Sequence, residues 1–512
     1  MKRVNGIKLR IGEPEESLIL KLAKFERIKV QDIKTFKIVK KSLDARDKAN
    51  IFFLYNVDYS LTQEMPLERD YRQVRGEAVV VGSGPCGLFC ALYLARSAVK
   101  VTLLERGSCV EDRKKITNTF YTAGKLNTEC NVQFGEGGAG TFSDGKLNTQ
   151  VNNERIQTVL DDFVDFGAPK EIAYLAKPHI GSDNLPRVIK NIRNEIIRLG
   201  GDVIFNARLC DLLLKSGAVE GVVYEKNAVK HLIKTSRVVL AVGHSARDTF
   251  EMLNSRGVVM ESKDFAVGFR IEHRQDFIGF AQYGKQFNLL PSAEYKLVSH
   301  AGERDVFTFC MCPGGYVMPA TSEENAVVTN GMSEFARDGM NANSALVCKV
   351  TRADFCGEDA LSGVRFQRAL EQKAYIAGGG NYKAPVQLVK DFINKKESFS
   401  FDGVLPTYNL GTEFYPLHDF FEKSFTNSLI SATIDMSKKI KGFVENGAIF
   451  TGVESRTSSP LRILRGENLQ SVNTVGLYPA GEGAGYAGGI TSAAADGIKV
   501  ANAIVNELVN NE

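Results

Sequence analysis

The hydrophobic and polar positions of the first sixty residues predict a small unit that combines a helix with strands. Apolar residues recur at helical spacing in "EESLILKLAKFER", residues 15–27. The segments "TFKIVKKSL" (35–43) and "NIFFLYNVDYSL" (50–61) have the β-branched and aromatic content of strands. The next stretch, 62–77, is polar and contains a proline, which indicates a linker. We therefore expect a small α+β domain over residues 1–75.

Residues 78–105 pass from an apolar strand to a glycine loop, then to an alanine- and leucine-rich helix and a second strand. The loop has the spacing G-x-G-x-x-G at Gly82, Gly84 and Gly87. In a dinucleotide-binding unit these glycines permit a tight turn, approach of the backbone to a pyrophosphate, and close packing of helix on strand. Glu105 ends the second strand 23 residues after Gly82, where an acid binds ribose hydroxyls. The segment predicts a nucleotide site of the Rossmann type.

Two further glycine clusters occur later in the chain. "NVQFGEGGAGTFSDGKLNT" (131–149) has five glycines in the eleven positions from 135 to 145. This density indicates close approach of the backbone to a flat or anionic group. "GEGAGYAGG" (481–489) has five glycines in nine positions and precedes a helix-forming segment. The exposed N–H groups at such a helix start stabilise negative charge.

Together these segments resemble the FAD domain of the glutathione-reductase-type flavoproteins. "TSRVVLAVGHSARD" (235–248) has the pattern of a buried strand that runs into Gly243, with A-V-G where that group has A-T-G. "VGLYPAGEG" (475–483) corresponds to a late strand of that group, with Glu482 where Asp is usual. The resemblance implies that the glycine clusters bind the two ends of one FAD. Gly488 and Gly489 would then lie against the isoalloxazine.

Shorter segments resemble one bacterial family, the uncharacterised FAD-dependent dehydrogenases. They are "GEGGAGTFSDGKL" (135–147), "PHIGSDNL" (178–185) and "RTSSPLRI" (456–463). The resemblance spans most of the chain and implies an α/β fold with a discontinuous FAD-binding Rossmann domain, but no settled substrate. The expected domains are a small basic α+β domain (1–75), the two parts of the FAD-binding domain (76–262 and 451–512) and an antiparallel-sheet substrate domain (263–450).

The motifs and the resemblance give a set of expected FAD-binding residues. They are Gly82, Gly84, Pro85, Gly87, Glu105, Arg106, Gly137, Gly138, Gly140, Thr141, Leu209, Gly243, Gly481, Glu482, Gly488, Gly489 and Ile490. The catalytic residues stay open. The candidates to orient a substrate or to stabilise negative charge at the flavin are Asp144, Lys146, His244, Arg247 and Arg456.

Other motifs limit the function classes. The chain has no second G-x-G-x-x-G after a strand and no C-x-x-x-x-C near the first helix, which argues against a pyridine-nucleotide disulfide reductase. In "CMC", Cys310 and Cys312 are expected on one face of a strand. A redox or metal role stays open for them, but buried strand cysteines are the favoured interpretation and no metal site is expected.

Composition adds the expected location and partners. The 512 residues are 44% hydrophobic and 24% charged, as in soluble globular proteins, and no apolar run reaches the ~18 residues of a membrane helix. Nine scattered cysteines and the lack of a signal peptide favour the cytoplasm. Residues 1–50 carry 14 Lys/Arg against 7 Asp/Glu, a charge of +7 in a chain of net charge +4. We interpret this basic segment as the solvated face of a small domain. Binding of nucleic acid through it stays open as an alternative.

We therefore expect an FAD-dependent oxidoreductase. Its small substrate would lie between the FAD domain and the sheet domain, with an unidentified electron donor or acceptor. Two alternatives remain: a flavin-dependent RNA-modifying protein that uses the basic N-terminal domain, and a non-catalytic flavoprotein sensor or scaffold.

Overall fold

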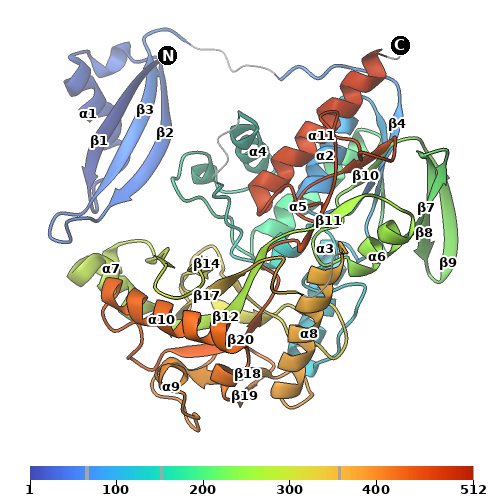
Figure 1. Ribbon diagram of the computed structural model, residues 1–512. Helices are drawn as coiled ribbons and strands as arrows, with labels where there is room; N and C mark the ends of the chain where they lie inside the picture. The colour runs from blue at the N-terminus through green and yellow to red at the C-terminus, as the bar shows by residue number, and fades with distance from the viewer. Residues whose placement is uncertain (64–68, 150–153, 356–358, 511–512) are drawn as a thin grey trace.

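The N-terminal residues form a small sheet of their own in the computed structural model, which describes residues 1–63, 69–149, 154–355 and 359–510. The sheet is antiparallel with the order β1-β3-β2 and carries one α-helix (Figure 1). Tyr55, Val57 and Tyr59 of the central strand pack with Leu18 and Leu22 of the helix. The elements are β1 (Lys2–Arg10), α1 (Ser17–Glu26), β2 (Thr35–Asp44) and β3 (Phe52–Ser60).

A five-stranded parallel sheet forms the centre of one of the two large parts of the molecule, which lies uppermost in Figure 1 and is called the upper body. Its spatial order is β22 (Leu477–Pro479), β10 (Val238–Leu240), β4 (Glu77–Val81), β5 (Lys100–Leu104) and β6 (Asp202–Ile204). Val80 of β4 packs into one hydrophobic core, and its neighbours Val79 and Val81 pack into another. Because both faces of the sheet are covered, the sequence of β4 is a continuous apolar run.

Helices cover one face of this sheet and an antiparallel meander covers the other (Figure 1). Helices α2 and α11 pack along each other, although residues 97–489 separate them in the sequence. The helices of the upper body are α2 (Pro85–Arg96), α3 (Val110–Ala123), α4 (Glu154–Asp165), α5 (Leu185–Arg198), α6 (Arg247–Ser255) and α11 (Ile490–Asn510). The meander is β7 (Arg208–Lys215), β8 (Ala218–Lys226) and β9 (Val229–Lys234).

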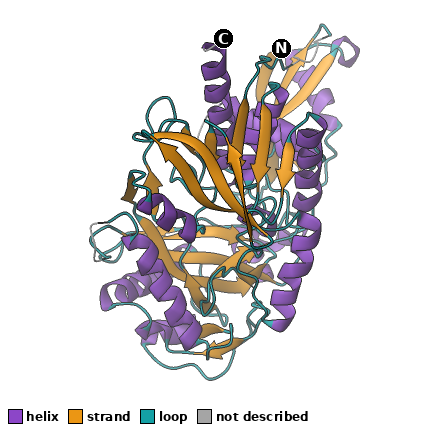
Figure 2. Cartoon of the chain, turned by 90° about the vertical axis from the view of Figure 1, so that its right-hand side faces the viewer, coloured by secondary structure: helices purple, strands orange, loops and turns teal. Residues whose placement is uncertain are grey.

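A second, seven-stranded sheet lies below the first and is antiparallel except for its last pair (Figures 1 and 2). In order it contains β13 (Val298–Ser299), β14 (Val306–Cys312), β17 (Asn341–Val350), β12 (Phe265–Arg274), β20 (Ile449–Glu454), β18 (Ala384–Leu388) and β19 (Thr412–Phe414). One face packs on α7 (Gln275–Tyr283), α8 (Ser362–Ala377), α9 (Val389–Asn394) and α10 (Lys423–Lys439). The antiparallel sheet predicted for this part of the chain is therefore present, and β20 carries it past the predicted limit at residue 450.

Two short strand pairs join these layers. Strand β11 (Met260–Ser262) pairs with β21 (Leu461–Ile463) where the chain leaves and re-enters the upper body. Strand β15 (Tyr316–Pro319) pairs with β16 (Thr329–Met332) beside the seven-stranded sheet.

Residues 69–76, predicted as part of a linker, pack against the upper body instead. Val74 is buried, and its N–H donates to the carbonyl of Ser97 at 3.0 Å. Arg69 donates at 2.6 Å to Asp162, a fully buried carboxylate that also accepts the hydroxyl of Tyr93. Residues 64–68 lie outside the described residues. We propose that the small N-terminal unit ends before Arg69, earlier than the predicted limit at 75.

The small unit contacts the rest of the chain through the edge strand β2. The N–H of Lys41 donates to the carbonyl of Tyr174 at 2.7 Å, and the N–H of Ala176 donates to the carbonyl of Lys41 at 2.8 Å. Lys48 Nζ also donates to the carbonyl of Ala281 at 2.7 Å. These contacts are hydrogen bonds confined to a small area, whereas the apolar side chains of the small unit pack against one another.

The longest helix, α11, has 21 residues. Within the described ranges, no helix combines the length and the apolar character needed to cross a membrane.

We predict that a chain beginning at Arg69 folds and keeps its cofactor, whereas a chain beginning at Glu77 is destabilised. The shorter chain loses buried Val74 and leaves Asp162 without Arg69. Loss of one buried aliphatic side chain alone costs about 2 kcal/mol or more. Soluble yield and the midpoint of urea unfolding of the two truncated chains measure the difference. Equal stability of the two chains would contradict the assigned packing.

Candidate functional site

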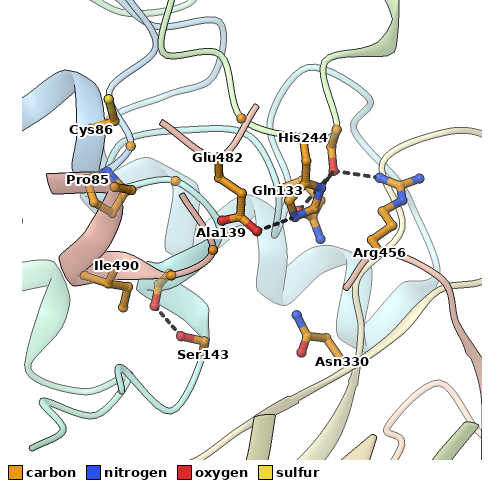
Figure 3. A pocket seen from close by; sticks show the side chains of 18 of the residues that line it. Pro85, Cys86, Gln133, Ala139, Ser143, His244, Asn330, Arg456, Glu482 and Ile490 are labelled. Carbon is orange, nitrogen blue, oxygen red and sulfur yellow. Dashed lines mark hydrogen bonds and ion pairs between the residues drawn. The ribbon is translucent and has the colours of Figure 1, made fainter. Parts of the chain in front are cut away.

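A cavity of about 580 Å³ lies between the carboxyl ends of the parallel strands and the seven-stranded sheet. This edge of an open parallel sheet is where such folds bind ligands. The volume falls within the roughly 300–1,000 Å³ of small-molecule and cofactor sites. Segments from both bodies of the molecule line it, as Figure 3 shows for Pro85, Gln133, His244, Asn330 and Glu482.

The first glycine motif folds as the sequence predicts. Gly82 has φ +99°, and a Cβ there would lie 2.3 Å from the carbonyl oxygen of Ala241. A Cβ on Gly87 would lie 1.8 Å from the carbonyl oxygen of Gly82, so α2 packs directly on the turn. Gly84 caps α2 and faces the cavity, with only Gly138 near its missing side chain. The N-terminus of α2 therefore opens on the cavity.

The second glycine cluster lies against the first. The N–H of Gly137 donates to the carbonyl of Ser83 at 2.9 Å, and a Cβ on Gly138 would lie 2.9 Å from the Cα of Gly84. A Cβ on Gly140 would lie 2.9 Å from Ile490, the first residue of α11. Segments from three distant parts of the sequence thus meet at one wall of the cavity.

Three glycines expose bare backbone to open space. A Cβ on Gly243, Gly488 or Gly489 would meet no protein atom within 4 Å, and all three residues line the cavity. Gly488 and Gly489 directly precede α11, whose first N–H groups have no carbonyl partner within the helix. The residues present therefore fit a large, flat, partly anionic group such as FAD.

Most residues expected to bind FAD surround this cavity. Those that line it are Gly82, Gly84, Pro85, Glu105, Arg106, Gly138, Gly140, Leu209, Gly243, Glu482, Gly488, Gly489 and Ile490. Four others lie behind the wall and support it by close packing: Gly87, Gly137, Thr141 and Gly481.

Glu105 has more protein partners than the motif suggests. One carboxylate oxygen accepts the N–H of Ser83 at 2.8 Å and its hydroxyl at 2.7 Å. The other oxygen accepts the N–H groups of Gly107 and Gly135, each at 2.9 Å. These four donors fill the acceptor sites of a carboxylate. In this structure Glu105 ties three loops together, and a ribose hydroxyl would have to displace the Ser83 hydroxyl.

Glu482 and His244 approach each other at the wall of the cavity (Figure 3). Burial raises the pKa of Glu482 to about 7, with Lys263 acting in the opposite direction. Burial, with Arg456 and Arg247 nearby, lowers the pKa of His244 to about 3. The imidazole is therefore neutral at pH 7, and its 3.9 Å approach to Glu482 is not an ion pair there.

Two candidate arginines share one buried carboxylate. Arg456 and Arg247 both donate to Glu371, each at 2.7 Å, and Glu371 is fully buried. Arg456 also donates at 3.0 Å to the hydroxyl of Ser245 and lines the cavity (Figure 3). Arg247 lies behind it, away from the cavity lining, and also pairs with Glu323. The arrangement fixes one guanidinium at the cavity and neutralises part of its charge.

The cysteine pair departs from strict strand alternation. Strand β14 is irregular between Phe309 and Cys312, and Cys310 has φ +43°. Consequently Cys310, Met311 and Cys312 all line the cavity, with the surface of Cys310 accessible and that of Cys312 buried. Among the described residues, no group of three or more His, Cys, Asp or Glu is placed to hold a metal ion.

The sequence did not indicate the charged wall that the seven-stranded sheet presents to the cavity. Glu454 lines the cavity, and Arg270 lies directly behind it, fully buried. Asn330 projects from β16 into the same space (Figure 3). The available signal was the alternation in "FAVGFRIEHR", where Arg270 and Glu272 replace apolar residues on one face of a buried strand.

Comparison with known proteins identifies the family. Residues 264–457 match the model of the FAD-dependent protein, C-terminal domain-like family, and residues 76–277 match that of the pyridine nucleotide-disulphide oxidoreductases. An uncharacterized protein of Clostridium beijerinckii is 45% identical over 99% of this chain and 98% of its own length. The chain belongs to a family of FAD-dependent oxidoreductases. Its cofactor is FAD. Residues 1–60 match a domain of unknown function.

Solved structures align with this chain only weakly. A flavoprotein/dehydrogenase from Cytophaga hutchinsonii aligns with a TM-score of 0.40 at 12% identity, covering 86% of this chain and 80% of that one. A geranylgeranyl bacteriochlorophyll reductase-like protein from Thermoplasma acidophilum aligns with a TM-score of 0.36 at 11% identity, over 85% and 80% of the two chains.

We predict that Glu105→Ala destabilises the FAD-free protein by on the order of 3 kcal/mol, because four buried donors lose their acceptor. Glu482→Gln is the matched control, since the Glu482 carboxylate accepts no hydrogen bond from the described residues. It should not destabilise the FAD-free protein, because burial already disfavours the charged form of Glu482. Glu105→Ala should also weaken FAD binding more than Glu482→Gln does. Urea unfolding and fluorescence titration with FAD measure both effects, and equal behaviour of the two variants contradicts the assignment.

We also predict that Gly488→Leu leaves the FAD-free protein as stable as the wild type but weakens FAD binding at least about tenfold. The new side chain meets open space rather than protein, so it competes only with a ligand. Gly488→Ala, with a single methyl group, should have a smaller effect on affinity. The dissociation constant for FAD and the unfolding midpoint are the two measurements. Unimpaired FAD binding by the leucine variant would show that the cofactor lies elsewhere.

Proposed function

We propose that FAD occupies the cavity with its pyrophosphate at the N-terminus of α2 and its isoalloxazine against residues 488–490. Gly84 at the first place and Gly488 and Gly489 at the second support this orientation, because a Cβ on any of them would meet no protein atom closer than 3.8 Å. The N-terminus of a helix stabilises a phosphate at one end and negative charge on the flavin at the other. We place the FAD-binding domain in residues 69–262 and 455–512 and the sheet domain in residues 263–454.

The proposed reaction is oxidation or reduction of a small molecule held between the flavin and the seven-stranded sheet. The flavin supplies the redox chemistry, while the chain supplies position and electrostatics. The observation that carries the proposal is the asymmetry of the cavity: bare glycine backbone forms one wall, and the side chains of Cys310, Asn330 and Glu454 form the opposite wall. A cofactor alone requires no such second wall.

The residues that line this space set its charge and its hydrogen-bonding groups. Neutral His244 and buried Arg456 lie on one side, where a hydrogen-bond donor and a fixed positive charge face the cavity. Cys310 brings a thiol whose open surface faces the cavity while protein surrounds it on its other sides. This surrounding protein raises the pKa of the thiol to about 12, so it is protonated at pH 7. The wall therefore offers neutral and cationic groups to a bound molecule, with Glu454 and Glu482 as the titrating acids.

The structure offers less support for the RNA-modifying alternative. Several cations of the small unit are paired with acids of the same unit: Lys2 with Glu26, Arg3 with Asp58, Lys21 with Glu13, Lys41 with Glu15 and Arg46 with Asp44. This pairing reduces the free positive charge available to phosphates. Steep loss of RNA retention with added salt would revive that alternative.

We predict that the purified protein is yellow and releases FAD, not FMN, when it is denatured by heat. The expected ratio is close to one FAD per chain. Chromatography of the released chromophore against both standards tests the cofactor, and anaerobic reduction of the bound flavin by candidate donors tests the reaction. A colourless protein that cannot be reconstituted with FAD contradicts the proposal. Bound flavin that no donor reduces and no acceptor reoxidises favours the sensor or scaffold alternative.

A further inference from the structure

The polar face of the seven-stranded sheet carries a buried ion pair that the core does not require. Alternate residues of β12 face opposite ways: Phe269 and Ile271 enter the hydrophobic core, and Arg270 lies on the side of the cavity. Arg270 is fully buried, and its Nη1 lies 3.4 Å from a carboxylate oxygen of Glu454. Buried charges are expensive and are retained mainly where they serve a function.

The Glu454 carboxylate is held loosely for a buried group. Within the described residues its two oxygens have one partner each, Arg270 at 3.4 Å and the hydroxyl of Thr329 at 3.4 Å, both long for hydrogen bonds to a carboxylate. Burial raises the pKa of Glu454 to about 7, although Arg270 and Thr329 act in the opposite direction. By contrast, the neighbouring buried Glu272 accepts short bonds from Thr407 and Asn341.

Arg270 itself is fixed by groups other than Glu454. It donates at 2.6 Å to the carbonyl of Cys310 and at 3.1 Å to the side chain of Asn343. A Cβ on Gly331 would lie 2.6 Å from its Nη2, so glycine is required there for the guanidinium to fit. Glu454 is therefore free to change its protonation state without releasing Arg270.

A second charged group reaches the cavity from the glycine-rich segment. Asp144 is buried and accepts Arg337 Nε at 3.0 Å, while the Lys146 ammonium stays 3.7 Å from the same carboxylate. Two cations thus share one anion, which leaves a positive charge in excess. Lys146 lines the cavity, and its ammonium donates no hydrogen bond to any of the described residues.

The thiol of Cys310 links these groups. Lys146 and Arg270 both act to lower its pKa, and Glu454 acts to raise it, against the larger effect of burial. The three charges therefore lie around one short stretch of cavity wall. Thr308, Asn330 and Gly331 complete the lining there.

We infer that this part of the cavity, between Lys146 and Glu454, binds a small anionic substrate, such as a carboxylate, and that Glu454 takes up a proton when the anion binds. The inference rests on the proposed function only in calling the bound molecule a substrate. Lys146 supplies the positive charge that the anion needs. Glu454 must be neutral, because an ionised carboxylate beside the anion repels it.

The groups that face Glu454 are few. They are Arg270 from β12, Thr329 from β16 and Cys310 from β14. Lys146 with its partner Asp144, and Lys177, Glu294 and Lys296, line the same cavity. Arg456, two residues further along the chain, is held by Glu371. Burial raises the pKa of the Cys310 thiol, and the pKa of Arg270 is also raised, whereas Glu454 has a pKa of about 7.

The test uses the flavin-loaded protein and two matched probes, acetate and uncharged acetamide. Binding is measured by calorimetry and by perturbation of the flavin absorption spectrum. We expect acetate to bind and acetamide not to bind. Acetate affinity should fall up to about tenfold per pH unit above about pH 7, as Glu454 ionises. Calorimetry in buffers of different ionisation enthalpy should show proton uptake.

Three variants assign the effect to residues. Lys146→Met should weaken acetate binding by about tenfold or more, and Lys146→Arg should keep it within about threefold. Glu454→Gln mimics the neutral acid, so it should keep the affinity found at low pH and lose both the pH dependence and the proton uptake. Each variant is compared with the wild type at equal flavin content, so that a change in acetate binding is not caused by loss of the cofactor.

The outcomes separate this inference from the proposed function. A preparation without flavin contradicts the proposed function, while calorimetry on it still reports the anion site, since Lys146 and Glu454 belong to the chain. Flavin-loaded protein that binds neither probe, or both equally, overturns the anion site. An unchanged pH dependence in Glu454→Gln overturns the role of Glu454.

Discussion

The carboxylate of Glu105 holds together the backbone segments on which the rest of the site depends. Its four hydrogen bonds join the turn at Ser83, the loop after β5 at Gly107 and the second glycine cluster at Gly135. With these loops fixed, Gly84 and Gly138 come into direct contact, and no side chain separates them. Gly140 in turn approaches Ile490 at the start of α11, so the wall continues to the third glycine segment.

The opposite wall obeys a different constraint. The seven-stranded sheet buries large aromatic residues such as Phe269 and Phe450 on its helical side, and this packing supplies its stability. The other side is thereby released from the need to be apolar, and it carries Arg270 and Glu454. An unpaired charge in such a place costs several kcal/mol. The 3.4 Å contact between Arg270 and Glu454 is long, and Arg270 is held mainly by the carbonyl of Cys310 and the side chain of Asn343. The cavity therefore combines a rigid glycine wall with a titratable one.

Local signals in the sequence predicted the glycine wall well. Gly82 and Gly87 sit in backbone positions that admit no side chain, and such positions are readable because the requirement lies within a few residues. The helix and two strands of the small N-terminal sheet were also predicted, whereas β1 (Lys2–Arg10), which pairs with β3, was not. The FAD cofactor and the family followed from the same motifs and are confirmed by the comparisons.

Features that depend on distant partners were not predictable. Arg270 and Glu454 are 184 positions apart and meet only when β12 pairs with β20. The packing of residues 69–76 depends on Asp162, whose burial no local pattern reveals. The full set of donors on Glu105 required the position of Gly135, which only the folded loops supply. In each case the deciding contact joins residues far apart in the sequence.

One FAD is proposed to span the glycine segments of the cavity. Hydrogen–deuterium exchange of the protein with and without added FAD tests this placement. We predict that FAD slows exchange at the same time in three separate stretches, 82–88, 135–141 and 483–493, because the ligand covers their exposed N–H groups. Protection confined to 82–88, or protection in the small N-terminal sheet instead, would contradict the account.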